Sequence, residues 1–237
     1  MSETIFAVHG IESHAGWFEP LARALEARGV ALIAVDRAGS GRDARPRGDT
    51  PGLATWLDEV ERGAMATGKK VHLLGHSWGA RLALAATLER RASAFASLVL
   101  LTPGIFAAPD LPRPDQADVL DAMRRGGSQT FPIGIPDVRF SRAPSVLEYL
   151  ARDPHRLREV TARFLLEDAR LGRSLAAARE FAVPTRLLLA ENDAIVDEAR
   201  TRAWFHAMGG KDIEVFAGAG HLVLLEQTEA LAERLVP

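Results

Sequence analysis

Short apolar runs alternate with helix-length amphipathic segments over the first hundred residues, and this alternation constrains the fold more than any other feature. Strands are expected at 4–8, 31–35, 71–74 and 97–101, and helices at about 17–28, after Thr50-Pro51, and at 78–91. The run 31–35 is continuously apolar, which is typical of a strand buried on both faces of a parallel sheet. Strands separated by helices predict an α/β fold, a parallel sheet with right-handed crossovers.

The alternation stops after Leu101 and resumes at Pro184. Beyond that proline we expect a strand at 185–190, a helix near 198–208, a strand at 213–216 and a last helix from about 223 to 235. The intervening stretch carries prolines at 103, 109, 112, 114, 132, 136 and 144, no strong strand, and a long helical region at about 145–179. We therefore expect a core of residues 1–103 and 183–237, with residues 104–182 inserted as a helical cap or lid.

Composition removes several function classes. The 237 residues have a net charge of −2, which leaves no basic surface for nucleic acid or an anionic membrane. The absence of cysteine rules out disulfides, Cys-ligated metal sites and thiol catalysis. Apolar runs are too short to cross a bilayer, and Met1–Thr4 leads into a strand without a basic leader. The expected location is the cytoplasm; oligomeric state stays open.

The segment Gly75-His76-Ser77-Trp78-Gly79 lies where the strand 71–74 meets the following helix. A serine flanked by two small residues at a strand-to-helix junction is typical of a nucleophile elbow, a strained turn that holds the hydroxyl above the sheet edge. The helix N-terminus there favours developing negative charge. This pattern predicts that Ser77 is a nucleophile.

A serine nucleophile needs a base, and the base needs a carboxylate to orient it. In this architecture the order along the chain is Ser, acid, His, each in a loop after a late strand. His221 follows the strand 213–216 and is the expected base; the other histidines lie in strands, helices, the elbow or the cap. Asp193 follows the strand 185–190 and is the expected acid, with Glu191 and Asp197 as rivals.

An oxyanion hole is expected from two backbone N–H groups. One belongs to Trp78, the residue after the nucleophile, and the other to the loop after the first strand. Gly10 permits close approach of that loop, so Ile11 N–H is the expected second donor.

The chain resembles the α/β-hydrolase superfamily and, within it, the monoglyceride-lipase or lysophospholipase-like group of the serine aminopeptidase S33 type. The motifs that carry the resemblance span most of the chain: His9-Gly10-Ile-Glu-Ser-His14-Ala-Gly16, Asp36-Arg37-Ala-Gly39-Ser-Gly41, the elbow, Glu191-Asn-Asp193, and Gly218-Ala-Gly-His221. The resemblance implies a mostly parallel sheet flanked by helices and a cap, here without the usual N-terminal strand hairpin.

The implied activity is hydrolysis of carboxylic esters, acylglycerol-like, lysophospholipid-like or small, without metal or organic cofactor. A thioesterase or lactonase would use the same groups. An S33-type aminopeptidase would need acidic cap residues, for which Glu148, Glu167 and Asp168 are candidates, and a catalytically silent binding protein is the non-enzyme alternative. Apolar cap residues would bind the small-molecule acyl substrate, with Phe106, Phe131 and Tyr149 as candidates; a self-contained surface insertion is the alternative.

Overall fold

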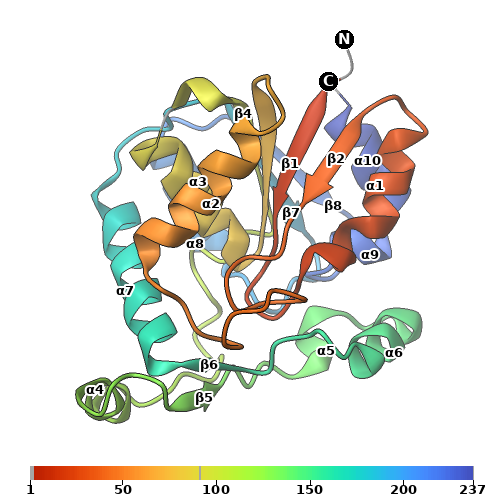
Figure 1. The fold of residues 1–237 in the computed structure, drawn as a ribbon. Coiled ribbons are helices and arrows are strands. Elements are labelled where there is room, and N and C mark those ends of the chain that lie inside the picture. The colour runs from red at the N-terminus through yellow and green to blue at the C-terminus, as the bar shows by residue number, and fades with distance from the viewer. Residues whose placement is uncertain (1–2, 91, 237) are drawn as a thin grey trace.

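Six parallel strands form the centre of the structure, a computed structural model that describes residues 3–90 and 92–236 (Figure 1). Their order across the sheet is β2-β1-β3-β4-β7-β8. The strands are β1 (Thr4–Val8), β2 (Ala31–Ala34), β3 (Val71–His76), β4 (Phe95–Leu101), β7 (Thr185–Ala190) and β8 (Asp212–Phe216). The reversal of strand order beside β1 and β3 is where a doubly wound sheet places its site, at the carboxyl ends of the strands.

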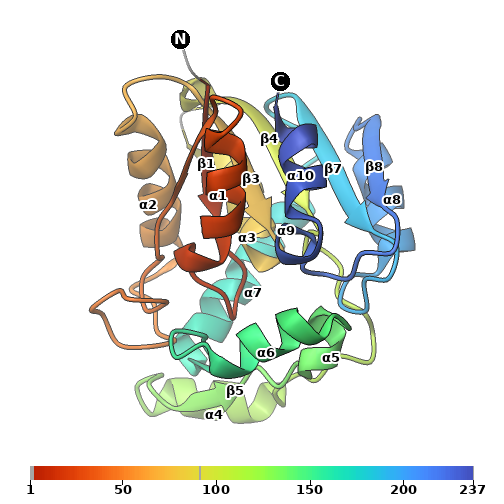
Figure 2. The ribbon, with the colours of Figure 1, turned by 90° about the vertical axis from the view of Figure 1, so that its right-hand side faces the viewer.

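Helices cover both faces of this sheet (Figures 1 and 2). On one face lie α1 (Glu19–Glu26), preceded by the 3-10 turn Ala15–Phe18, α9 (Val223–Glu226) and α10 (Thr228–Leu235). On the other lie α2 (Leu53–Met65), α3 (Trp78–Glu89) and α8 (Glu198–Ala207), with a short 3-10 turn at Ala92–Ala94 before β4. Each face buries its own apolar cluster, one around Trp56, Phe164 and Phe205 and the other around Trp17, Phe18 and Phe216.

The segment between β4 and β7 lies across the carboxyl ends of the strands (Figure 1). It contains α4 (Gln116–Arg124), β5 (Thr130–Pro132), α5 (Asp137–Phe140), α6 (Pro144–Arg152), β6 (Glu159–Thr161) and α7 (Ala162–Ala177). Thr161 caps α7 by accepting a hydrogen bond from the Phe164 N–H, and Pro144 starts α6 at a position where a missing N–H costs little. The helix α7 packs beside α3 along its length and so joins the core.

Several expected elements differ from the structure. The strand β2 is not buried on both faces: it forms the edge of the sheet, and Ile33 is 38% exposed. The helical region expected at 145–179 is interrupted by β6, which pairs antiparallel with β5. The last helix, expected at about 223–235, is two helices, α9 and α10. The helix expected at about 17–28 begins as the 3-10 turn Ala15–Phe18 and continues as α1. Uninterrupted apolar sequence therefore marked β2 as a strand but could not show its place in the sheet.

None of the helices within residues 3–90 and 92–236 combines the length and apolar character that a bilayer span requires.

Candidate active site

Ser77 occupies the tight turn between β3 and α3. Its backbone has φ 55° and ψ −126°, a conformation that a non-glycine residue adopts only under strong local constraint. A Cβ on Gly75 would overlap the backbone of Ala80, and one on Gly79 would overlap the carbonyl oxygen of Val8. The two glycines are therefore required for α3 to start this close to β1 and β3, which is what holds the serine at the sheet edge.

The structure brings Ser77, His221 and Asp193 into one hydrogen-bonded line. His221 Nε2 lies 2.8 Å from Ser77 Oγ, and its Nδ1 lies 2.9 Å from Asp193 Oδ2. The second oxygen of Asp193 accepts hydrogen bonds from the N–H groups of Ile195 at 2.8 Å and Val196 at 3.0 Å. These donors fix the carboxylate, which then orients the imidazole to accept a proton from the serine.

The two other carboxylates near Asp193 have different partners. Glu191 accepts a hydrogen bond from the Gly218 N–H at 2.7 Å, and Asp197 accepts one from the Arg200 N–H as the N-cap of α8. Both therefore hold loops and a helix start in place. Only Asp193 of these three contacts the imidazole of His221.

Two residues that the sequence did not identify contact the backbone carbonyl and the ring of His221. The buried Thr102 donates its hydroxyl to the His221 carbonyl at 3.0 Å, and its own backbone has φ 40°. Phe140 packs edge-on against the imidazole, with ring centroids 5.9 Å apart. A single Thr or Phe in the sequence does not indicate these roles, because each role depends on contacts between segments distant in the chain.

His76, inside the elbow, lies beneath His221 with ring centroids 5.3 Å apart. Burial and the neighbouring His221 lower the pKa of His76 to about 3, so this imidazole is neutral at physiological pH. Its Nε2 faces the His221 carbonyl at 3.4 Å. It therefore faces the backbone of His221, whereas the imidazole that hydrogen-bonds the Ser77 hydroxyl is that of His221.

The loop after β1 lies directly against Ser77. A Cβ on Gly10 would sit 3.1 Å from Ser77 Cβ and 3.5 Å from Oγ, so any larger residue would crowd the serine there. Within the described part of the chain, the N–H groups of Ile11 and Trp78 have no hydrogen-bond acceptor. Both N–H groups are therefore available to another acceptor, and Trp78 directly follows Ser77 in the chain.

Arg37, which follows β2, is fully enclosed next to this loop. Its Nη1 donates to the Gly10 carbonyl at 2.7 Å and its Nη2 to the Ile11 carbonyl at 2.6 Å. The guanidinium also lies over the indole of Trp78, 4.8 Å from the ring centroid. Burial lowers the pKa of Arg37 to about 9, so the group is still a cation at pH 7. The sequence showed Arg37 only as part of a loop motif, with no indication of this placement.

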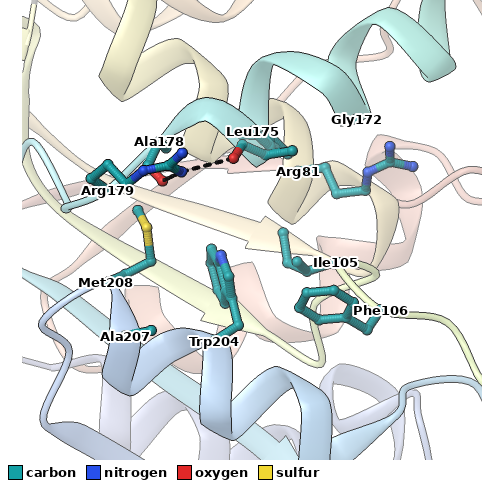
Figure 3. Close-up of a pocket in the computed structure, with 11 residues that line it drawn as sticks. Arg81, Ile105, Phe106, Gly172, Leu175, Ala178, Arg179, Trp204, Ala207 and Met208 are labelled. Carbon is teal, nitrogen blue, oxygen red and sulfur yellow. Dashed lines mark hydrogen bonds between the residues drawn. The ribbon is translucent and has the colours of Figure 1, made fainter.

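The three candidate substrate residues lie in three separate environments. Phe106 lines a cavity of about 400 Å³ together with Ile105 and Trp204, between α7 and α8 (Figure 3). Phe131 is buried in a small cluster with Ala122 and Ala162, inside the segment that crosses the strand ends.

Tyr149 is 40% exposed on α6, edge-on to the ring of Trp17. The structure therefore does not gather Phe106, Phe131 and Tyr149 around one point.

The acidic residues considered for an aminopeptidase also have other partners. Glu148 pairs with Arg152 on the exposed face of α6. Glu167 pairs with Arg170 and accepts the Leu53 N–H, and Asp168 binds Arg81 and the Trp78 indole N–H. Glu167 and Asp168 thus link α7 to neighbouring elements, whereas Glu148 pairs only within its own helix.

Comparison with known proteins places this geometry in a family. A family model described as serine aminopeptidase, S33 matches residues 1–228. Human monoglyceride lipase is 32% identical over 111 residues, which cover 45% of this chain but only 36% of the human enzyme. The chain thus aligns with little more than a third of that relative's length.

Solved structures match over nearly the whole chain. The monoacylglycerol lipase of Paleococcus ferrophilus superposes with a TM-score of 0.84 at 23% identity, over 98% of this chain and 93% of that one. A soluble variant of monoglyceride lipase from Saccharomyces cerevisiae superposes with a TM-score of 0.83 at 14% identity, over 99% and 85%. These likenesses show the α/β-hydrolase fold, and with the family match over residues 1–228 they show that the chain belongs to the serine aminopeptidase S33 family of α/β-hydrolases.

Proposed function

We propose that this chain is a serine hydrolase that cleaves carboxylic esters through an acyl-enzyme on Ser77. The observation that carries the proposal is the line from Ser77 Oγ to His221 Nε2 at 2.8 Å and from His221 Nδ1 to Asp193 Oδ2 at 2.9 Å. The family match and the lipase structures support the same chemistry.

The reaction follows from these contacts in two steps. Ser77 Oγ attacks the ester carbonyl carbon while its proton passes to His221, and the oxyanion forms between the N–H groups of Ile11 and Trp78. Collapse breaks the ester C–O bond, and His221 gives the proton to the leaving alcohol. A water molecule, deprotonated by His221, then hydrolyses the acyl-enzyme and releases the carboxylic acid.

We further propose that residues 104–182 act as a cap and that the substrate is an acylglycerol-like or lysophospholipid-like ester. The position of this segment over the strand ends supports the first part (Figure 1). The likeness to monoglyceride and monoacylglycerol lipases supports the second. Because Glu148, Glu167 and Asp168 are engaged elsewhere, the contacts favour an ester over a substrate with a free amine.

A substrate panel tests this proposal. Purified protein is assayed with p-nitrophenyl esters, monoacylglycerols, lysophospholipids, an acyl thioester, a lactone and amino-acid anilides, beside Ser77→Ala and the control Ser97→Ala. Ser97 bonds His72 at 2.8 Å, away from the site. We expect ester turnover in wild type and Ser97→Ala and only background in Ser77→Ala. Anilides cleaved faster than every ester would instead identify an aminopeptidase.

A further inference from the structure

The Gly10–Ile11 peptide carries both an oxyanion donor and an acceptor that Arg37 occupies. In a trans peptide the C=O and the following N–H point in opposite directions. The structure has no cis peptide among the described residues, and Arg37 Nη1 binds the Gly10 oxygen at 2.7 Å. The direction of the Ile11 N–H is therefore set by the side chain that holds Gly10 O.

The same guanidinium fixes the next peptide. Arg37 Nη2 binds the Ile11 oxygen at 2.6 Å, so two consecutive carbonyls are held by one planar group. His9 completes the contact: its Nε2 accepts from the Arg37 backbone N–H at 3.2 Å, and its Nδ1 lies 2.9 Å from Gly10 O. Burial and the adjacent Arg37 lower the pKa of His9, which keeps this ring neutral.

Arg37 also contacts the side chain of Trp78, the residue whose backbone N–H is the second expected donor. Its guanidinium stacks on the indole of Trp78 at 4.8 Å and lies 5.7 Å from the ring centroid of Phe164. The backbone N–H of Trp78 is the other group expected to bind the oxyanion. One buried cation therefore contacts both residues whose N–H groups are expected to form the hole, although among the described residues it has no hydrogen bond to Ser77 or His221.

We infer that Arg37 is a positioning residue that aims the Ile11 N–H at the oxyanion and keeps the two donors at a fixed separation. This inference rests on the proposed function, because it needs an oxyanion to act on. Loss of one oxyanion donor typically lowers kcat by 10²–10³-fold, and a displacement of about 1 Å can cost about 10²-fold. We expect Arg37→Lys and Arg37→Met to lose at least about tenfold in kcat, with little change in KM.

A transition-state analogue separates this role from a structural one. An alkyl trifluoromethyl ketone forms a hemiketal when Ser77 Oγ adds to its carbonyl carbon and the serine proton passes to His221, which leaves the negative oxygen in the hole. The corresponding methylene ether of a p-nitrophenyl ester has no carbonyl and reports ground-state binding alone. In both variants we expect the Kd of the ketone to rise by the same factor by which kcat/KM falls. The Kd of the ether should equal that of wild type.

Arg90→Lys is the matched control. Arg90 is also a partly buried arginine, but it follows the end of α3 that lies farthest from Ser77, where it binds Asp58 at 3.0 Å and the Ala54 carbonyl of α2. The control should have a lower Tm than wild type, but its ratio of ketone affinity to ether affinity should be unchanged. Folded Arg37 variants with undiminished ketone affinity would overturn the inference, and so would failure of both variants to fold, which would make Arg37 a core residue. A wild type that neither hydrolyses esters nor binds the ketone would refute the proposed function instead.

Discussion

Asp193 faces His221 with one carboxylate oxygen, 2.9 Å from Nδ1, while its other oxygen is held by two backbone N–H groups. The same tight loop places Asp197, only four residues later, at the N-cap of α8 with its side chain bound to the Arg200 N–H. The loop thus points the two carboxylates at different partners: Asp193 at the imidazole of His221, and Asp197 at the start of α8.

This difference predicts opposite results for two isosteric substitutions. Asp193→Asn removes the charge that orients and stabilises the imidazolium, so kcat should fall by about 10³–10⁴-fold. Asp197→Asn still caps a helix and should lower kcat less than about threefold, because asparagine is an equally good N-cap residue. Steady-state kinetics on a p-nitrophenyl ester measures both; a larger loss in Asp197→Asn would refute the assignment of the acid.

The elbow glycines predict a stability effect that depends on position. Gly79→Ala places a methyl group into the Val8 carbonyl, so it should cost more than about 2 kcal/mol of unfolding free energy or prevent folding. Gly172→Ala lies in α7 and meets only the end of the Arg81 side chain, so it should be neutral or slightly stabilising. Urea unfolding followed by circular dichroism compares the two, and equal costs would contradict this account of the turn.

Two buried imidazoles predict acid sensitivity. Burial lowers the pKa of His76 to about 3 and lowers that of His9 as well, while both groups have an ordinary pKa near 6.5 when the chain is unfolded. Below pH 6.5 the unfolded state therefore binds more protons, and stability falls as the pH drops toward 3. Between pH 7 and pH 5 His76 alone should remove about 2 kcal/mol of unfolding free energy, and His9 acts in the same direction.

The variant His76→Asn measures the contribution of His76 to this loss of unfolding free energy. The variant should lose about 2 kcal/mol less than wild type over the same pH range, whatever its stability at pH 7. His206→Asn, at an exposed position on α8, controls for loss of an imidazole. Parallel pH dependences for wild type and His76→Asn would show that His76 takes up a proton in the folded protein.

The separate locations of Phe106 and Phe131 predict different effects on substrate choice. If the cavity beside Phe106 receives the acyl chain, kcat/KM should rise with chain length from acetate toward octanoate, by at most about 0.8 kcal/mol per methylene. Phe106→Ala should change this profile, whereas Phe131→Ala should lower thermal stability and leave the profile intact, because Phe131 packs within its own cluster. A flat profile in wild type would show that the cap does not form an acyl site.

The parts of the site that the sequence predicted share a local signature. Ser77 lies between two glycines at a strand–helix junction, and His221 and Asp193 each follow a late strand, so short-range pattern was enough to nominate them. The structure then brings these three together. The alternation of strands and helices predicted the α/β fold for the same reason.

The features that the sequence did not reveal depend on long-range packing. Thr102 and Phe140 contact His221 from segments far away in the chain, and Arg37 reaches the loop after β1 from the end of β2. The exposed edge position of β2 and the β5–β6 pair likewise follow from which strands become neighbours. Residue type and spacing carry no direct signal for such contacts.

The central claim is that Ser77 is a covalent nucleophile activated by His221, and a fluorophosphonate tests it without any choice of substrate. After reaction, intact-mass analysis should show one adduct per chain, and peptide mapping should place it on Ser77. Ser77→Ala should not react, and His221→Ala should react far more slowly than wild type, because its serine lacks a base. An adduct on another residue, or labelling that persists in Ser77→Ala, would contradict the account.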